Sequence, residues 1–296
     1  MARAALILNP AAGQGRPKVA RDRLMHIMSE VGLDCRISLT GEPGDGLRLA
    51  REAAGDGYDL VVAVGGDGTV NEVVNGLAGL DTPLGILPLG SVNVLARELA
   101  IPLDLPRAAR VLVDGTLRRI DLGMAAGRYF TLMAGFGFDA EVVSNVHPPV
   151  KDIIGPSAYV LKSLEALTYY QATEMSIEMD GRTYQAKAFA AIIGNSSMYG
   201  YPLKVTPHAC MDDGLLDICI FERPMTDRIG FLHQMVDIFR ERHLHHPDVQ
   251  YFRARHVVIE SEPEVMMQLD GDLFGNTPAE VSIVPRSLPL MVPCFP

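Results

Sequence analysis

The chain has 296 residues, of which 48% are hydrophobic and 21% are charged, a composition typical of a soluble globular protein. Its 26 basic and 36 acidic side chains give a formal net charge of −10, which argues against sequence-independent binding of nucleic acid. No stretch approaches the roughly 18 apolar residues that a membrane-spanning helix needs. The four cysteines form no C-x-x-C pair, so we expect reduced thiols in the cytosol and neither a disulfide framework nor a zinc site.

Strand-like and helix-like patterns alternate up to about residue 120. The short apolar runs typical of buried parallel strands are residues 4–8, 60–64 and 84–87. The segments with helical spacing of apolar residues are 20–31, 70–77 and 92–99. This alternation predicts a doubly wound parallel α/β sheet.

The second half of the chain favours a mainly antiparallel β domain that carries helices. Its strand-like segments are residues 176–179, 184–193, 216–221 and 257–260, and its helical stretches are residues 158–170 and 227–240. We therefore expect an α/β fold of two domains, residues 1–121 and 122–296. The sequence leaves open whether the last residues pack back on the first domain.

A glycine-rich loop, Gly65-Gly66-Asp67-Gly68-Thr69, follows a buried strand and precedes a helix. At that position glycines let the backbone approach a phosphate, and the helix start offers N–H groups. The loop is not a Rossmann fingerprint, which needs glycine where Asn71 stands, and no Gly-Lys-Ser/Thr of a Walker A loop occurs. Because the Asp67 carboxylate would repel phosphates, it indicates a divalent cation between them.

The stretch from Gly65 to Leu77, GGDGTVNEVVNGL, resembles the signature of the diacylglycerol kinase catalytic-domain family, which includes bacterial lipid kinases and sphingosine and ceramide kinases. Further segments resemble the family in the same order: residues 9–15, 84–91, 135–140, 212–217 and 269–272. The resemblance covers nearly the whole chain. It implies a nucleotide-binding α/β domain, similar in plan to NAD kinases, followed by a β-rich domain for the lipid substrate.

For ATP, the resemblance implies contacts from the backbone of two loops, with Thr40 and Ser91 as side-chain contacts. The residues implied are Asn9, Pro10, Ala11, Gly13, Thr40, Gly65, Gly66, Asp67, Gly68, Thr69, Val70, Asn71 and Ser91. Ser91 replaces the threonine usual in the family.

Phosphoryl transfer needs the γ-phosphate held, its charge neutralised and the acceptor hydroxyl deprotonated. The resemblance implies that Asp67 and Asp121 organise a catalytic Mg²⁺. It also places Asp272 where the family has a glutamate regarded as the proton acceptor, with Asp270 as the rival candidate.

A second, structural Mg²⁺ is implied at Asp213, completed by main-chain oxygens of Cys210 and Leu215. Taken alone, the segments 270–272 and 212–214 have the composition of ordinary tight turns. The cluster of His243, His245 and His246 indicates a solvated helix end rather than a zinc site.

Two departures from the family bear on the reaction. Val94 follows Asn93 where many members have an acid, and Asp272 is one methylene shorter than glutamate, about 1.5 Å. The leading hypothesis is an ATP- and Mg²⁺-dependent kinase of a diacylglycerol-like or sphingoid-like lipid, acting in phospholipid biosynthesis. The alternatives are an NAD kinase and a non-catalytic nucleotide- or lipid-binding protein; the sequence does not identify the acceptor.

A lipid kinase must meet its substrate at a membrane, and the sequence predicts a cytoplasmic protein peripheral to the inner face. The apolar, proline-broken segment 146–156, with the helix that follows, is a candidate lipid entrance, although a surface loop before a core helix fits as well. Whether the chain forms a homodimer is left open.

Overall fold

The computed structural model describes residues 3–12, 17–145, 165–200 and 202–294. They form two compact units, the first comprising Met1–Leu122 with Pro285–Pro296 and the second Gly123–Val284. Among the described residues, no helix is both long enough and apolar enough to cross a bilayer. The segment 146–156, proposed above as a lipid entrance, lies outside the described residues.

The first unit alternates strands and helices as expected. In chain order its elements are β1 (Arg3–Leu8), α1 (Pro17–Glu30), β2 (Asp34–Leu39), α2 (Asp45–Gly55), β3 (Leu60–Gly65), α3 (Asp67–Leu77), β4 (Leu84–Pro88), α4 (Val94–Glu98), α5 (Leu105–Asp114) and the start of β5 (Thr116–Ala125). The strands pair in the order β4-β3-β1-β2, all parallel. The predicted parallel α/β sheet is confirmed.

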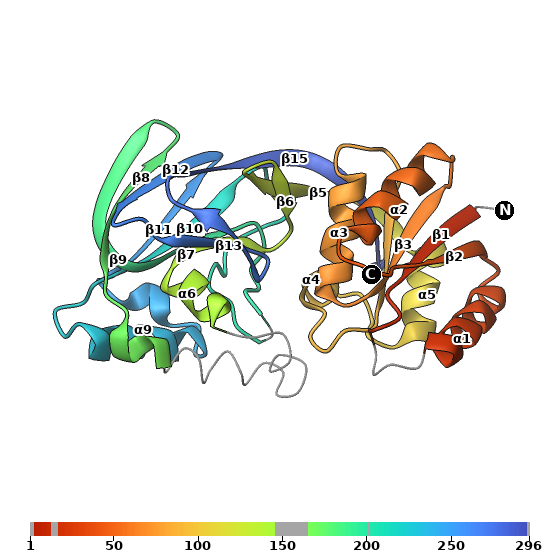
Figure 1. Ribbon diagram of the computed structural model, residues 1–296, viewed down its shortest axis with the longest axis horizontal. Coiled ribbons are helices and arrows are strands. Elements are labelled where there is room, and N and C mark those ends of the chain that lie inside the picture. Colours follow the sequence, from red (N-terminus) through yellow and green to blue (C-terminus); the bar gives the residue numbers. More distant parts are fainter. Residues whose placement is uncertain (1–2, 13–16, 146–164, 201, 295–296) are drawn as a thin grey trace. The chain divides into compact units, whose positions relative to one another are not determined.

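Helices on the sheet explain why its central strand is apolar throughout. Every residue of β3 is buried, because α2 packs beside α3 and α1 packs beside α5 around the sheet (Figure 1). A strand covered on both faces has no solvent side and therefore shows no polar alternation.

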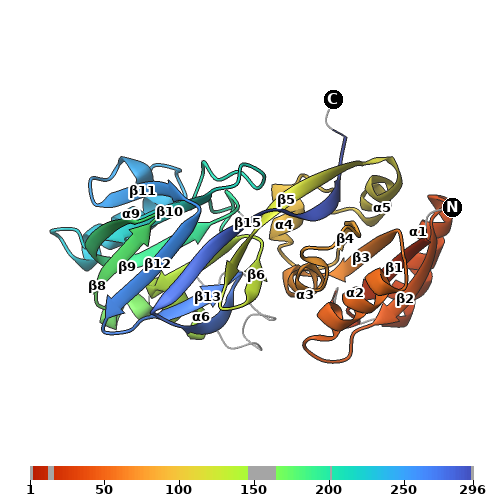
Figure 2. The ribbon, with the colours of Figure 1, turned by 90° about the horizontal axis from the view of Figure 1, so that it is seen from above.

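The second unit is built from antiparallel strands. Its elements are the end of β5, β6 (Arg128–Phe130), β7 (Met133–Gly137), α6 (Phe138–Ser144), β8 (Thr173–Met179), β9 (Arg182–Gly194), β10 (Leu216–Glu222), α9 (Arg228–Ile238), η1 (His243–His245), β11 (Val249–Ala254), β12 (His256–Glu262), β13 (Met266–Leu269), β14 (Asp272–Asn276) and the start of β15 (Ala279–Val292). The strands β14-β13-β7-β9-β8-β12-β15 lie side by side, and β10 and β11 continue from β9 (Figure 2). The expected antiparallel β domain with helices is confirmed.

Strand β9 separates two apolar clusters of this unit. Ala191 and Ile193 belong to one cluster, while Ala190 and Ile192 belong to the other, as the two-residue period of a strand dictates. The second cluster includes Phe231 of α9, which stacks on Phe189 with ring centroids 4.4 Å apart. Helix α9 is therefore anchored to the sheet through aromatic packing.

The histidine cluster after α9 is only partly a solvated helix end. His243 is fully buried, and its Nε2 donates to the carbonyl oxygen of Val205 at 2.9 Å. His245 is exposed, and His246 pairs with Asp237 at 2.9 Å. The expectation is wrong for His243, because a segment 38 residues earlier in the chain supplies its partner and its cover.

Strand β15 carries the chain from the second unit back into the first. Its residues from Ala279 to Ser282 pair with β12, and Leu290 pairs with Leu84 of β4. Leu288 and Leu290 are fully buried. The end of the chain is thus part of the core of the first unit.

Candidate active site

The loops singled out by the sequence meet at one edge of the parallel sheet. Backbone N–H groups just beyond three strands donate to neighbouring strand ends: Asn9 to Val64 at 3.0 Å, Thr40 to Leu8 at 3.0 Å and Leu89 to Gly65 at 2.8 Å. This is the carboxyl edge, where ligands bind in open α/β sheets. The fold therefore brings Asn9, Thr40 and the glycine loop together.

Asn9 ties the first loop to the glycine loop. Its Nδ2 donates to Thr69 Oγ1 at 3.1 Å, and its Oδ1 accepts from the N–H of Ala11 at 2.9 Å. Pro10 and Ala11 lie in this described turn, whereas Gly13 lies outside the described residues. The side chain of Asn9 thus shapes the loop and does not depend on a nucleotide for its partners.

The glycines of the loops serve two purposes. A Cβ on Gly65 would lie 2.5 Å from Thr69 Oγ1, so glycine at position 65 leaves room for the Thr69 side chain. A Cβ on Gly90 would lie 2.5 Å from the Cα of Gly66, so Gly90 allows the two loops to pack backbone against backbone. A Cβ on Gly68 would meet nothing within 4 Å, and Gly68 is exposed. Protein packing therefore does not account for glycine at position 68.

The start of α3 supplies the N–H donors expected of a phosphate cradle. The first-turn amides of a helix, here including those of Gly68 and Thr69, have no partner within the helix. The N–H of Val70 already donates to Gly66 at 3.0 Å, and buried Asn71 accepts from the side chain of Asn75. The geometry thus concentrates the predicted contacts on the first turn.

Asp67 lies between the starts of two helices. Its carboxylate accepts the backbone N–H of Asn93 at 3.0 Å and that of Val94 at 2.7 Å. Asn93, with φ of 55°, also holds the neighbouring loop, because its side chain bonds both the N–H and the carbonyl of Gly90. Ser91 in that loop is exposed. Val94 is buried, so no acid of α4 faces Asp67 at this position.

Asp121, the second acid assigned to the catalytic cation, is fully buried in β5. Its Oδ1 accepts the backbone N–H of Arg286 at 2.7 Å. Arg286 has a φ of 52° in β15. The carboxylate therefore joins β5 to β15, a task that the sequence motif did not reveal.

Asp270 belongs to a tight hairpin turn. Leu269 pairs with Asp272, and the two residues between them, Asp270 and Gly271, have φ of 48° and 87°, as in a type I′ turn. The Asp270 carboxylate accepts the N–H groups of residues 131–133 at 2.7–3.0 Å and the hydroxyl of Thr131 at 2.9 Å. Burial raises the pKa of the Asp270 carboxyl, and these donors counteract the rise.

Asp272, on the other side of the turn, has an exposed side chain. It forms an ion pair with Arg128 at 2.9 Å, and the Arg128 guanidinium lies over the ring of Phe274, 5.1 Å from its centroid. Of the two rival carboxylates, Asp270 has its oxygens engaged by the backbone, whereas Asp272 has solvent access. Arg128 was missed by sequence reasoning because it lies 144 residues from its partner.

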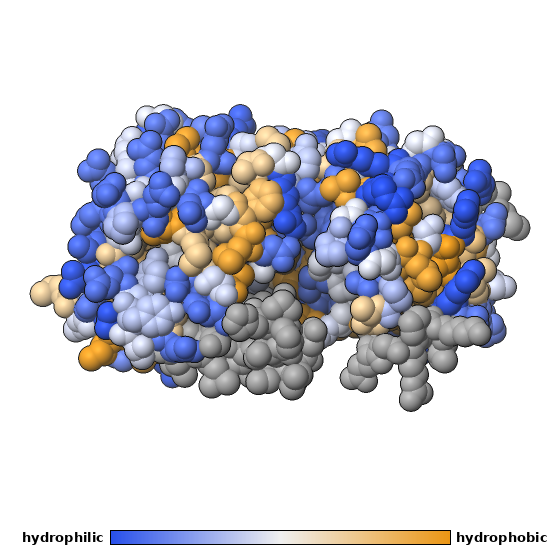
Figure 3. Space-filling model, in the orientation of Figure 1, coloured by the Kyte–Doolittle hydropathy of each residue, from blue (hydrophilic) through white to orange (hydrophobic). Residues whose placement is uncertain are grey.

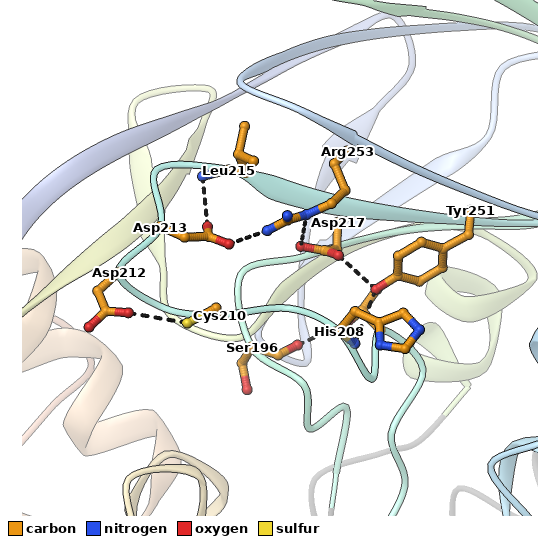
Figure 4. A network of polar contacts seen from close by, with 10 residues as sticks. Ser196, His208, Cys210, Asp212, Asp213, Leu215, Asp217, Tyr251 and Arg253 are labelled. Atoms are coloured by element: carbon orange, nitrogen blue, oxygen red, sulfur yellow. Dashed lines mark hydrogen bonds and ion pairs between the residues drawn. The ribbon is translucent and has the colours of Figure 1, made fainter.

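The predicted second metal site lies in the polar network of Figure 4. Asp213 accepts the N–H of Leu215 at 3.0 Å, and its other oxygen pairs with the guanidinium of Arg253. The thiol of Cys210 donates to Asp212 at 3.2 Å. Arg253 also reaches Asp217, which is fully buried. A positive charge therefore already lies on the carboxylate that was expected to bind Mg²⁺.

The two expected cation sites differ in their fit. Asp67 offers a carboxylate beside the cradle, and Mg²⁺ commonly takes only one or two protein carboxylates and keeps several waters. At Asp213 one carboxylate oxygen is paired with Arg253 and the other accepts the N–H of Leu215. Among the described residues, no three or more His, Cys, Asp or Glu side chains gather in a way that would hold a metal ion. Asp67 therefore fits a water-rich catalytic cation, and Asp213 as arranged does not fit a second one.

Two family models together match most of the chain. The model described as diacylglycerol kinase catalytic domain matches residues 3–125, and the model described as YegS C-terminal NAD kinase beta sandwich-like domain matches residues 133–292. Their limits follow the change from parallel to antiparallel strands.

Named relatives match over more than nine tenths of their length. The diacylglycerol kinase of Bacillus subtilis (strain 168) is 32% identical over 296 residues, 99% of this chain and 97% of that protein. That of Staphylococcus aureus (strain MRSA252) is 33% identical, covering 98% and 92%. A crystal structure of a diacylglycerol kinase from Bacillus anthracis superposes with a TM-score of 0.76 at 25% identity, covering 98% and 96% of the two chains. A further structure from that organism gives 0.83 at 28% identity, covering 98% and 95%.

Proposed function

The chain belongs to the diacylglycerol kinase catalytic-domain family and is a lipid kinase, and from this premise we propose that it transfers the γ-phosphoryl group of ATP, with Mg²⁺, to a hydroxyl of a diacylglycerol-like lipid. The observation that carries the proposal is the open cradle at Gly68, where the first-turn amides of α3 meet a position without protein cover. A helix start lined by glycine is suited to a phosphate chain.

In this proposal the first unit binds ATP. The amides of Gly68 and Thr69 would donate to phosphate oxygens, and the Asn9–Thr69 bond would keep the two loops at a fixed spacing. Thr40, directly after β2, and Ser91, in the loop after β4, would contact the nucleotide through their hydroxyls. Binding the phosphates in a fixed position beside preorganised N–H donors lowers the activation barrier of phosphoryl transfer.

Asp67 would hold the catalytic cation, with buried Asp121 as a more distant acid of the same network. When bound, Mg²⁺ neutralises the negative charge that develops on the transferring phosphate. Because Asn93 and Val94 donate to Asp67, the carboxylate is held in place before a nucleotide arrives. The α4 backbone would thus supply orientation where many relatives have a further acid.

Asp272 would accept the proton of the lipid hydroxyl while the hydroxyl oxygen bonds to the γ-phosphorus and ADP leaves. We assign this role to Asp272 because Asp270 is bonded to three backbone N–H groups and a hydroxyl. Arg128 would orient the Asp272 carboxylate through their ion pair. A general base must reach its proton within about 3 Å, so the shorter aspartate would require the acceptor to bind correspondingly closer.

The lipid acceptor also requires contact with a membrane, and we propose that the protein works at the cytoplasmic membrane surface. Around α9, Met225, Ile229 and Phe239 are 104%, 67% and 60% exposed. Figure 3 shows hydrophobic residues reaching the surface among hydrophilic ones. Exposed apolar side chains are the means by which a chain of net charge −10 can adhere to lipid.

This contact is tested by liposome sedimentation of Ile229→Glu/Phe239→Glu. We expect the variant to lose most of its binding to anionic vesicles while binding ATP normally. Leu39→Glu/Leu117→Glu is the matched control, since these leucines of the first unit are 49% and 53% exposed. Equal binding by both variants would remove α9 from the membrane-contact surface.

The activity is tested by incubating the purified protein with Mg²⁺ and γ-labelled ATP against mixed micelles of diacylglycerol or of sphingosine, with NAD in a parallel reaction. We expect label in an organic-phase product, and none with Asp67→Ala. Label on NAD would favour an NAD kinase. ATP binding without transfer to any acceptor would favour a non-catalytic binding protein.

A further inference from the structure

A buried chain of hydrogen bonds ends at the backbone of the turn between Asp270 and Asp272. Gln268 of β13 is fully buried, and its Oε1 accepts the N–H of Gly271 at 2.6 Å. Its Nε2 donates to the Asp139 carboxylate of α6 at 2.8 Å, and the hydroxyl of Tyr199 donates to the other oxygen of Asp139. Through Gln268, two separate segments of the second unit, α6 and the segment that carries Tyr199, are thereby linked to the turn.

From this arrangement we infer that Gln268 and Asp139 are positioning residues for the reaction, which fix the turn that carries Asp272. The inference rests on the proposed function, since Asp272 is the proposed proton acceptor. Asp270 fixes one side of the turn through residues 131–133. The Gln268 amide fixes the other side at Gly271, the residue directly before Asp272.

Burial and steric fit restrict which residues can stand at the positions of this hydrogen-bond chain. Asp139 is 7% exposed, and burial raises the pKa of its carboxyl. Its polar partners in the described part of the chain are Tyr199 and Gln268. A Cβ on Gly135, the strand partner of Gln268, would lie 1.6 Å from Asp139 Oδ2. The bond between Gln268 and Asp139 thus passes over a residue that must lack a side chain.

The orientation of the Gln268 side-chain amide is set by its two hydrogen-bond partners. Its oxygen faces an N–H donor and its nitrogen faces a carboxylate acceptor, so the amide cannot be reversed without losing both bonds. Gln268→Glu would place a second carboxyl beside Asp139, where two buried acids cannot both be ionised. Adding Asp139→Asn would restore a donor opposite the new acceptor. The bond would then run in the opposite direction, and the N–H of Gly271 would keep its acceptor.

The experiment measures lipid phosphorylation by wild type, Gln268→Glu, and Asp139→Asn/Gln268→Glu. For Gln268→Glu we expect kcat to fall by about 100-fold, the order associated with a misplacement of about 1 Å, with the KM for ATP unchanged. The double variant should recover most of kcat. Gln234→Glu is the matched control: Gln234 is equally buried, in α9, so its acid should lower stability without lowering kcat in the folded enzyme.

Hydrogen exchange supplies a readout that does not depend on activity. The exchange rate of the backbone amides of residues 266–276 should increase in Gln268→Glu. It should return to the wild-type rate in the double variant and equal the wild-type rate in Gln234→Glu. If wild type phosphorylates no lipid, the proposed function fails, whereas the exchange data still test the turn. Unchanged exchange or unchanged kcat in Gln268→Glu, or a double variant no better than the single one, would overturn the inference. Should Gln268→Glu not fold, Gln268→Met, which removes both bonds without adding a charge, replaces it.

Discussion

Gly65 and Gly68 lie three residues apart and are glycine for different physical reasons. Gly65 has Thr69 where its side chain would be, whereas Gly68 faces open space at the start of α3. Within a helix glycine costs about 0.5–1 kcal/mol relative to alanine. Because Gly68 lies in the first turn of α3 at the carboxyl edge of the sheet, we propose that it is glycine so that a ligand can come close to the backbone.

Gly68→Ala should raise the free energy of unfolding by about 0.5–1 kcal/mol and lower ATP affinity by about tenfold, since overpacking costs about 1–3 kcal/mol. Urea denaturation and calorimetric titration with ATP measure the two effects. Gly55→Ala in α2 is the control, because Gly55 also faces open space in a helix and should gain stability with no change in ATP affinity. An Ala variant at position 68 that binds ATP normally would contradict the cradle.

His243 makes the stability of the second unit depend on pH. Burial lowers the pKa of His243, whereas in the unfolded chain it titrates near 6.5. Between these two values the unfolded chain binds more protons, so the free energy of unfolding decreases as the pH falls through this window. The neutral ring is the form that the pocket stabilises.

Replacing the imidazole should remove this dependence. His243→Gln, whose amide can still donate to Val205, should lose less stability than wild type between about pH 7.5 and about pH 5.5. Urea denaturation at both pH values measures the difference. His26→Gln, a change at a side chain that is 74% exposed, should behave as wild type. A wild-type slope in His243→Gln would show that another group causes the loss.

At the scale of elements, the pairing of β10 with β11 places the guanidinium of Arg253 against the buried carboxylate of Asp217. Asp217 and Arg253 are register partners on adjacent antiparallel strands, and Tyr251 also donates to Asp217 at 2.8 Å. Burial raises the pKa of the Asp217 carboxyl, and Arg253 offsets part of the cost of burying its charge. The same guanidinium reaches Asp213, so a cation at Asp213 would have to displace it.

Arg253→Gln should lower the free energy of unfolding by about 1–3 kcal/mol, because a buried acid loses a charged partner. We propose that Mg²⁺ binds Asp213 only when Arg253 is gone. The comparison is made in an Asp67→Ala background, because Mg²⁺ at the proposed catalytic site would itself raise the Tm. In that background Mg²⁺ should raise the Tm when Arg253 is replaced and leave it unchanged when Arg253 is present. Lys187→Gln, which breaks the exposed cross-strand pair with Glu174, should cost less than about 1 kcal/mol and show no response to Mg²⁺ in the same background. A rise in the Tm with Mg²⁺ while Arg253 is present would restore the second site.

At the scale of the whole molecule, the first unit is discontinuous in sequence. Its core includes Leu288, Leu290 and Val292 of β15, which are 0–3% exposed. The backbone N–H of Gly79 donates to the carbonyl of Ser287 at 2.9 Å. Strand β15 pairs with both β4 and β5, so the sheet of the first unit is complete only when β15 is in place.

Truncation after residue 284 should destabilise the ATP-binding unit, since each of these apolar side chains contributes about 1.5–3 kcal/mol when buried. We expect loss of ATP binding and rapid proteolysis within residues 3–122, with the second unit still protected. Truncation after Val292 is the control and should bind ATP normally. Retention of ATP binding by the shorter chain would show that the first unit does not need its returning strand.

The sequence alone was sufficient for the parallel sheet and for the position of the glycine loop. Buried strands, helical spacing and glycines are properties of neighbouring residues, because the strand and helix periods and the freedom of glycine act over a few positions. The turns at residues 270–271 and 212–214 could also be predicted from the sequence, because turn composition is likewise a property of neighbouring residues. Order along the chain then indicated the family, and with it the residues that are assigned to ATP.

Only the tertiary structure decided what the acidic side chains contact. Asp272 pairs with Arg128 across 144 residues, Asp270 bonds Thr131 across 139, and Asp213 meets Arg253 across 40. Such partners depend on which strands are adjacent and in what register, and a one-residue shift of register sends a side chain to the opposite face. Local sequence does not encode that choice. It arises when distant strands bury their apolar faces together, and the polar partners follow from the packing.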